Sequence, residues 1–227
     1  MKKKTIIITR LIFGLFLFAL GSVFAINAKI GVAPWDVFHQ GVAKLTGITV
    51  GRANIYSGII IFIIDIILGQ DLGWGSIMNM ILIGTFMDIL MLNDLVPVFT
   101  GFTPKLIMLI LGIIIQGLGC YFYISVGLGT GPRDGLMVAL TKKTKRPVGI
   151  IKSSIDISVV TIGFILGGNL GIGTVIMAFF AGHIWQFIFK RLNFTISEID
   201  HRFIQDDVRV LKEKFNKHQQ GKEKTPQ

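Results

Sequence analysis

Six long runs of apolar residues, separated by short polar segments, dominate the sequence. Each run is close to the roughly 20 residues that an α-helix needs to cross about 30 Å of hydrocarbon. A soluble domain does not need six such runs, so the pattern predicts an all-α polytopic membrane protein with six transmembrane helices. The predicted spans are Leu11–Ala28, Ile48–Gly69, Trp74–Leu92, Leu106–Val126, Val148–Gly168 and Ile172–Phe189.

The second half of the chain repeats the first half at a fixed offset, the 98 positions that separate Pro34 from Pro132. The segment GVAPWD, which starts at Gly31, then coincides with GTGPRD, which starts at Gly129. Further along, LGQDLGWG coincides with LGGNLGIG without a gap. Because glycine, proline and aspartate recur in one register, we interpret residues 9–93 and 105–191 as two copies of one three-helix unit.

Three spans are an odd number, so the second copy must enter the membrane from the opposite side. Short cytoplasmic loops collect Lys and Arg. Here Lys and Arg gather before the first span, between Arg133 and Arg146, and from Lys190 onward, whereas Asn93–Pro104 has none. The sequence therefore predicts two inverted repeats, as in many secondary transporters, with both termini cytoplasmic in a cell membrane. The first apolar run resembles a signal peptide, but its counterpart lies deep in the chain, so we expect a retained span.

Each copy of the G-x-x-P-x-D pattern predicts a short helix after a span, over Pro34–Lys44 and over Pro132–Lys142. Glycine permits a sharp turn, and proline suits the first helical turn because its missing N–H would be unsatisfied there anyway. Such a helix is too short to span the bilayer, which leaves a re-entrant helix or one lying at the interface. The predicted turn residues are Gly31, Pro34, Gly129, Gly131 and Pro132.

Polar residues within or beside the spans are the candidates for solute binding, because intramembrane ionisable groups usually face a partner or a watery cavity. The candidates are Asp36, Asn54, Asp134, Lys152, Asp156 and His183. Structural roles stay open for most of them. Asp36 and Asp134 can simply complement a helix dipole. Lys152 and Asp156 can neutralise each other at i,i+4 spacing. His183 can be a helix contact rather than a proton relay.

Two further aspartates, Asp65 and Asp88, lie near span ends, where we expect them to reach water. Glycines that recur between the copies predict close approach of helices, the usual role of small residues in bilayers. They are Gly14, Gly21, Gly84, Gly112, Gly119 and Gly182.

Composition and charge agree with the prediction of a polytopic membrane protein. Hydrophobic residues make up 52% and charged residues 16% of the chain, against about 25% charged residues in soluble domains. The net charge of +10 lies at the edges of spans, so it indicates topology rather than nucleic-acid binding. No spacing matches a metal site, a phosphate loop or a nucleophile motif. We therefore expect no metal, no cofactor and no enzymatic activity.

The character of the sequence changes at Thr195. The segment TISE is typical of a capping box, and apolar residues then recur at helical spacing between charges. Residues 195–227 are therefore predicted to form a cytoplasmic amphipathic helix on the inner leaflet, ending in a disordered tail from Gln219.

The G-x-G-P-x-D segment, its echo in the first half, and the LGGxLGIGT turn before the last span resemble the YczE/YyaS/YitT-type family of bacterial integral membrane proteins. The resemblance covers Thr9 to Arg191, and Ala33 stands in the first copy where the second has Gly131. It implies a polytopic bacterial inner-membrane protein and carries over no substrate. We predict a secondary transporter of a small solute, with its site between the repeats. The alternative is an accessory or regulatory membrane protein that docks partners through its tail.

Overall fold

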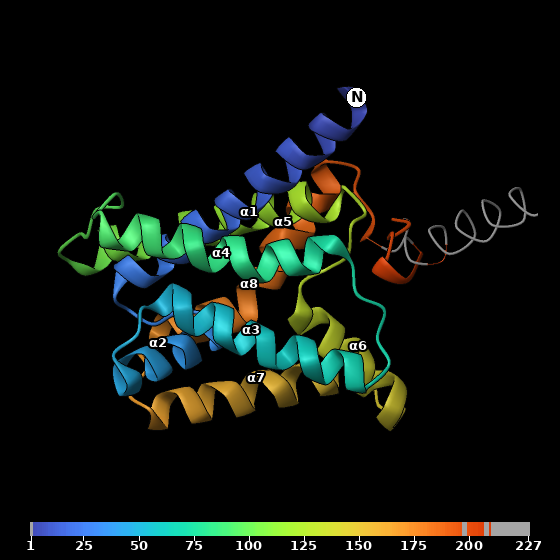
Figure 1. Ribbon diagram of the computed structural model, residues 1–227. Coiled ribbons are helices and arrows are strands. Elements are labelled where there is room, and N and C mark those ends of the chain that lie inside the picture. The colour runs from blue at the N-terminus through green and yellow to red at the C-terminus, as the bar shows by residue number, and fades with distance from the viewer. Residues whose placement is uncertain (1, 197–198, 207–208, 210–227) are drawn as a thin grey trace, which may run out of the picture.

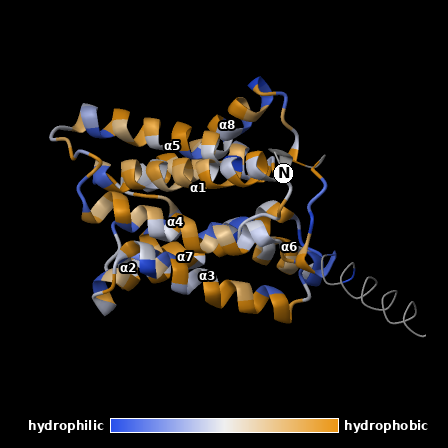
Figure 2. Ribbon diagram, turned by 45° about the horizontal axis from the view of Figure 1, so that its top comes forward, coloured by the Kyte–Doolittle hydropathy of each residue, from blue (hydrophilic) through white to orange (hydrophobic). Residues whose placement is uncertain are grey.

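The computed structural model describes residues 2–196, 199–206 and 209, and these residues form eight α-helices and no strand. Six of the helices are long and apolar enough to cross a membrane, and hydrophobic residues follow their length (Figure 2). The predicted all-α polytopic class is confirmed. The helices are α1 (Lys2–Ala28), α2 (Pro34–Thr46), α3 (Val50–Ile67), α4 (Trp74–Leu92), α5 (Phe102–Ile124), α6 (Pro132–Thr144), α7 (Val148–Ile165) and α8 (Ile172–Arg191).

The helices form two layers (Figure 1). One layer holds α1, α4, α5 and α8, with α1 packed on α4 and α5, and α5 packed on α8. The other holds α2, α3, α6 and α7, in which α2 contacts α7 and α3 contacts α6. The short helices α2 and α6 lie at opposite ends of this second layer in Figure 1. Their bounds are separated by the same offset as the sequence repeat, and so are those of α3 and α7.

The crossing of α1 and α5 forms the centre of the first layer. A Cβ atom on Gly14 would lie 2.9 Å from the Gly119 carbonyl oxygen, and one on Gly112 would lie 2.8 Å from that of Gly21. Only glycine allows the backbones to come this close, which increases van der Waals contact between the helices. Gly14 meets Gly119 and Gly21 meets Gly112, so the two helices run antiparallel. The predicted role of these four glycines is confirmed.

The two turns before the short helices have the same conformation. Gly31 has a φ of +112° and Gly129 a φ of +103°, values that side chains on L-residues disfavour. The proline that follows each turn lies in the first turn of its helix. Equivalent hydrogen bonds hold the turns: the Gly173 N–H donates to the Ile30 carbonyl and the Gly75 N–H to the Leu128 carbonyl, each at 2.7 Å. The sequence pattern thus predicted both turns correctly.

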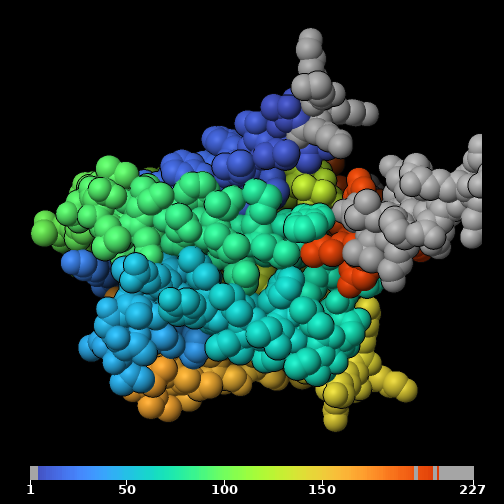
Figure 3. All heavy atoms as spheres, viewed as in Figure 1, coloured from blue at the N-terminus to red at the C-terminus, as the bar shows by residue number. Residues whose placement is uncertain are grey.

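The packing of α3 on α4 is not repeated between α7 and α8. A Cβ on Gly51 would overlap the Gly84 carbonyl oxygen, whereas Cβ atoms on the equivalent Gly149 and Gly182 would meet nothing within 4 Å. In the most apolar window of each helix, 39% of the residues are buried in α3 and α4, but only 6% in α7 and 17% in α8. Figure 3 shows the face on which α3 and α4 lie together. The expectation of close packing at Gly182 is wrong, because α7 stands away from α8 there.

The chain after α8 differs from the predicted amphipathic helix. Residues Ile199–Phe203 are not helical, because their backbone groups bind a loop of the membrane part. The Arg202 N–H donates to the Gly127 carbonyl at 2.8 Å. A helical turn begins only at Ile204. Most of the predicted tail, residues 207–208 and 210–227, and half of the predicted capping box, residues 197–198, lie outside the described residues.

Candidate solute pocket

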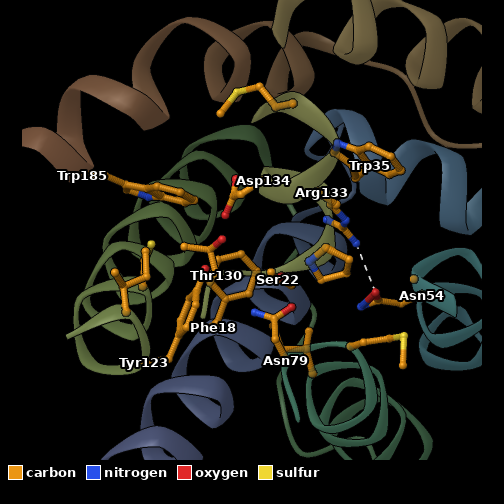
Figure 4. Close-up of a pocket in the computed structure, with 18 of the residues that line it drawn as sticks. Phe18, Ser22, Trp35, Asn54, Asn79, Tyr123, Thr130, Arg133, Asp134 and Trp185 are labelled. Atoms are coloured by element: carbon orange, nitrogen blue, oxygen red, sulfur yellow. Dashed lines mark hydrogen bonds between the residues drawn. The ribbon is translucent and has the colours of Figure 1, made fainter. Parts of the chain in front are cut away.

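A cavity of about 480 Å³ lies between the two layers. Helices α2 and α6, which lie at opposite ends of the second layer, both reach the cavity with their first turns. The remaining helices, α1, α3, α4, α5, α7 and α8, also contribute side chains to its lining. Figure 4 shows Arg133 and Asp134 of α6 projecting into it, with Trp35 of α2 beside Arg133. A volume of this size suits a small organic molecule.

Two repeat-equivalent residues meet at one side of the cavity. Trp35 and Arg133 occupy the same position in GVAPWD and GTGPRD. The Arg133 guanidinium lies 4.8 Å from the centroid of the Trp35 ring, a geometry in which the ring quadrupole attracts the cation. Trp35 and Asp36, which follow the first span, therefore form part of a polar centre to which both halves contribute.

Neutral groups, not carboxylates, hold the Arg133 guanidinium. Its Nη2 donates to Asn54 Oδ1 at 3.1 Å and lies 3.3 Å from His39 Nε2. Because arginine has no acceptor, a hydrogen bond from Arg133 requires Nε2 to be the unprotonated ring nitrogen, and Ser57 Oγ lies 3.0 Å from the same nitrogen. Nδ1 lies 3.6 Å from Asp36 Oδ1. Burial lowers the pKa of His39 to about 4, so the ring is neutral at physiological pH.

Five of the six predicted site residues line this one cavity, namely Asp36, Asn54, Asp134, Lys152 and Asp156. They come from α2, α3, α6 and α7, so only the tertiary fold brings them together. His183 is not among the lining residues. It is exposed on α8, and its Nδ1 lies 2.8 Å from the Phe179 carbonyl oxygen of the same helix.

Lys152 and Asp156 form the predicted ion pair at i,i+4 spacing on α7. The pair lies on the side of the cavity where α7 stands away from α8. The Lys152 side chain is 63% exposed and that of Asp156 is 24% exposed. The pair therefore lies at the mouth of the cavity rather than in its centre.

Asp65 lies in a different environment from the one expected. Its side chain is fully buried, and neither carboxylate oxygen has a hydrogen-bond partner among the described residues. It points at Gly135 of α6, where a Cβ would lie 2.6 Å from Oδ2. The expectation that Asp65 reaches water is wrong, because α6 covers this part of α3. Asp88 is only partly buried, and it binds the start of α3.

Sequence reasoning missed the aromatic residues of the cavity. Tyr123 and Trp185 carry no charge and sit in apolar runs, and Trp35 stands inside the repeated motif. It interpreted Arg133 as a topology determinant, since the residue begins a basic loop. One available signal was the difference between Trp35 and Arg133 inside an otherwise repeated motif, which marks a position where the two copies have specialised.

The fold and the cavity define a polytopic helical membrane protein with a polar centre enclosed between its two halves. The chain belongs to a family of unknown function, DUF6198, which it matches over residues 3–190. It is 34% identical to the uncharacterized membrane protein YczE of Bacillus subtilis, over 77% of this chain and 81% of the relative. It is 33% identical to an uncharacterized protein of Haemophilus influenzae, over 81% and 83%, and 24% identical to YyaS of Bacillus subtilis, over 78% and 91%. No solved structure matches the chain.

Proposed function

We propose that the protein is a secondary transporter that moves a small solute by alternating access, with its site in the cavity between two inverted repeats. The observation that carries the proposal is the asymmetry around the cavity. On one side, α3 and α4 touch at Gly51 and Gly84, and on the other, the equivalent Gly149 and Gly182 face open space. Two of the helices that line the cavity, α3 and α4, thus pack on each other, whereas the equivalent α7 and α8 do not.

Inverted topology is supported by three features. The equivalent helices α1 and α5 run antiparallel. The first turns of α2 and α6 face the cavity, whereas their last turns are exposed, as expected of re-entrant helices that enter from opposite faces. The basic connection after α6 is cytoplasmic by the positive-inside rule, which puts both termini in the cytoplasm of a bacterial cell and the mouth between α7 and α8 toward the same side.

The repeat itself suggests the second state of the transport cycle. If the halves exchanged their packing, α7 would close on α8 at Gly149 and Gly182, and α3 would separate from α4. The cavity would then open to the opposite face. Such an exchange would give each half the packing that the other half already shows.

Substitution of Gly182 by leucine tests this cycle. A side chain at Gly182 meets nothing within 4 Å in this state, so Gly182→Leu should fold normally yet prevent α7 from closing on α8. We expect cells with Gly182→Leu to lose the metabolite differences that separate wild-type cells from cells lacking the protein. The matched control is Phe180→Leu on the exposed side of α8, which should keep the wild-type profile. A wild-type metabolite profile in Gly182→Leu cells would refute the cycle.

Cysteine labelling tests the inverted arrangement directly. Lys44 and Lys142 are exposed and occupy equivalent positions in the last turns of α2 and α6. Each is replaced by cysteine in a Cys120→Ser background and treated with a membrane-impermeant maleimide. We expect only Lys44→Cys to react in intact cells. Labelling of both from the same side would exclude inverted repeats.

An accessory protein that docks partners through its tail is the second candidate, and the described part of the tail helps to separate the two. The Ile204 N–H donates to the Leu72 carbonyl at 2.9 Å, so the segment just after α8 is already bound to the membrane part. Deletion of residues 210–227 should leave a transporter active. An accessory protein would lose its effect on the cell, while Asp156→Asn would have none.

A further inference from the structure

We propose that the solute is a zwitterion that carries a carboxylate and an ammonium group, as amino acids do. This inference rests on the proposed transport function for its biological meaning, but it makes a separate claim about binding. Arg133 would hold the carboxylate and Asp134 the ammonium group, with the apolar part of the solute against the aromatic floor of the cavity.

The cationic end of the cavity has no carboxylate in direct contact, although Asp36 and Asp134 lie near enough to act on Arg133 electrostatically. No carboxylate oxygen lies within 4.0 Å of the Arg133 guanidinium among the described residues. Its hydrogen bonds to Asn54 and His39 occupy one nitrogen and go to a neutral amide and a neutral imidazole. The half-buried guanidinium therefore has no direct ion-pair partner among the described residues. The planar guanidinium, with donors left over, fits a carboxylate in a bidentate manner.

The anionic end is equally incomplete. Among the described residues, no Lys, Arg or His nitrogen lies within 4.0 Å of the Asp134 carboxylate. By contrast, Asp36 has His39 beside it and Asp156 has Lys152. Asp134 is therefore the cavity aspartate left without a cationic or imidazole neighbour at ion-pair distance.

The two unpaired charges belong to different sides of the cavity. In Figure 4, Arg133 lies on the side of Trp35 and Asn54, whereas Asp134 lies toward Trp185. The indole face is favourable for an ammonium group. The rest of the lining is largely apolar and aromatic, with Phe18, Tyr123 and methionine side chains beside the polar Ser22 and Asn79. A solute with one charge of each sign pairs both residues, whereas a simple anion or a simple cation leaves one of them unpaired.

Thermal unfolding of the purified full-length protein in detergent, with three pools of small molecules, tests the inference. The first pool holds the proteinogenic amino acids with β-alanine, γ-aminobutyrate and ε-aminocaproate. The second holds straight-chain carboxylates and the third straight-chain amines of similar length. We expect the amino-acid pool to raise Tm by about 4 °C when the compound that binds is present at about ten times its Kd. The other two pools should raise Tm clearly less.

Variants assign the shift to the two residues. Arg133→Gln and Asp134→Asn should each abolish it, whereas Arg52→Gln and Asp71→Asn, at exposed positions outside the cavity, should keep it. If Arg133→Gln fails to fold, Arg133→Lys retains the charge without the fork and should weaken binding about tenfold. Equal stabilisation by the carboxylate pool, insensitive to Asp134→Asn, would overturn the inference. A Tm shift with the amine pool equal to that with the amino-acid pool would overturn the inference too. So would the absence of a Tm shift with all three pools.

Metabolite profiling separates this inference from the transport proposal. If the compounds that differ between wild-type and Gly182→Leu cells lack either a carboxylate or an ammonium group, transport stands and the zwitterion is wrong. If the amino-acid pool binds through Arg133 and Asp134 but no metabolite differs, the zwitterion site stands and transport is wrong.

Discussion

The two halves of this protein share one sequence pattern and yet pack differently. In the first half, Asp88 of α4 accepts hydrogen bonds from the Thr49 hydroxyl and from the Gly51 N–H at the start of α3. In the second half the equivalent positions are Gln186 and Pro147, which provide no such connection. The repeat therefore sets where most of the helices begin, whereas a few polar side chains decide which pair of helices packs closely.

A second difference lies at the contacts between the halves. Where α3 meets α6, Asp65 supplies a side chain and Gly135 leaves room for it. Where α7 meets α2, the roles are reversed, since Gly163 lies against the backbone of Val37 and Phe38. The small residue thus lies on α6 in one contact and on α7 in the other, so a substitution at Asp65 and one at the equivalent Gly163 should act differently.

The largest effect is expected from alanine at the closed glycine contact. A methyl group at Gly51 would overlap the Gly84 carbonyl oxygen and crowd the Asp88 carboxylate, so Gly51→Ala should lower the free energy of unfolding by about 3 kcal/mol. The equivalent Gly149→Ala meets no atom within 4 Å and should not lower it. Titration with a denaturing detergent, followed by circular dichroism, measures both. Equal losses would mean that α7 and α8 are also packed in solution.

Removal of the polar connection in the first half should have the next largest effect. Asp88→Ala deletes the acceptor of two hydrogen bonds, and we expect a loss of about 2 kcal/mol in the same titration. Gln186→Ala, at the equivalent exposed position of α8, is the matched control and should be neutral. If both variants unfold like the wild type, Asp88 does not explain why α3 and α4 are closed.

Alanine at the interface between the halves should give effects of opposite sign. Asp65 is buried without a partner among the described residues, and such a polar group opposes folding. Asp65→Ala should therefore raise the free energy of unfolding by about 1 kcal/mol. Gly163→Ala, its repeat equivalent, should lower it, because a Cβ there would lie 2.5 Å from the Phe38 backbone. A destabilised Asp65→Ala variant would indicate that the carboxyl has an unrecognised partner.

The smallest effect is expected at the cavity mouth. The Lys152 side chain is 63% exposed, and exposed ion pairs contribute little because water and salt screen them. Lys152→Ala should change the free energy of unfolding by about 0.5 kcal/mol or less, and the difference should disappear at high salt. A loss comparable with that of Asp88→Ala would show that α7 is held in place by this pair.

The sequence alone determined the class of protein, the order and approximate positions of the helices and the two turns. These features depend on local properties, namely the length of apolar runs, the permissive backbone of glycine and the fixed φ of proline, and each leaves a mark within a few neighbouring residues. Gly31 and Pro34 could therefore be assigned to a turn and a helix start from the residues around them. The recurrence of the same marks at Gly129 and Pro132 revealed the repeat for the same reason.

The tertiary structure alone decided which side chains face one another. It placed Arg133 on Trp35, covered Asp65 with α6, and kept Gly182 away from α7 although its sequence equivalent is packed. These outcomes depend on how helices far apart in the chain approach, and contact energies between such helices leave no local pattern in the sequence. The charges around the cavity could be named from the sequence, but the residues left without a partner could only be found in the folded protein.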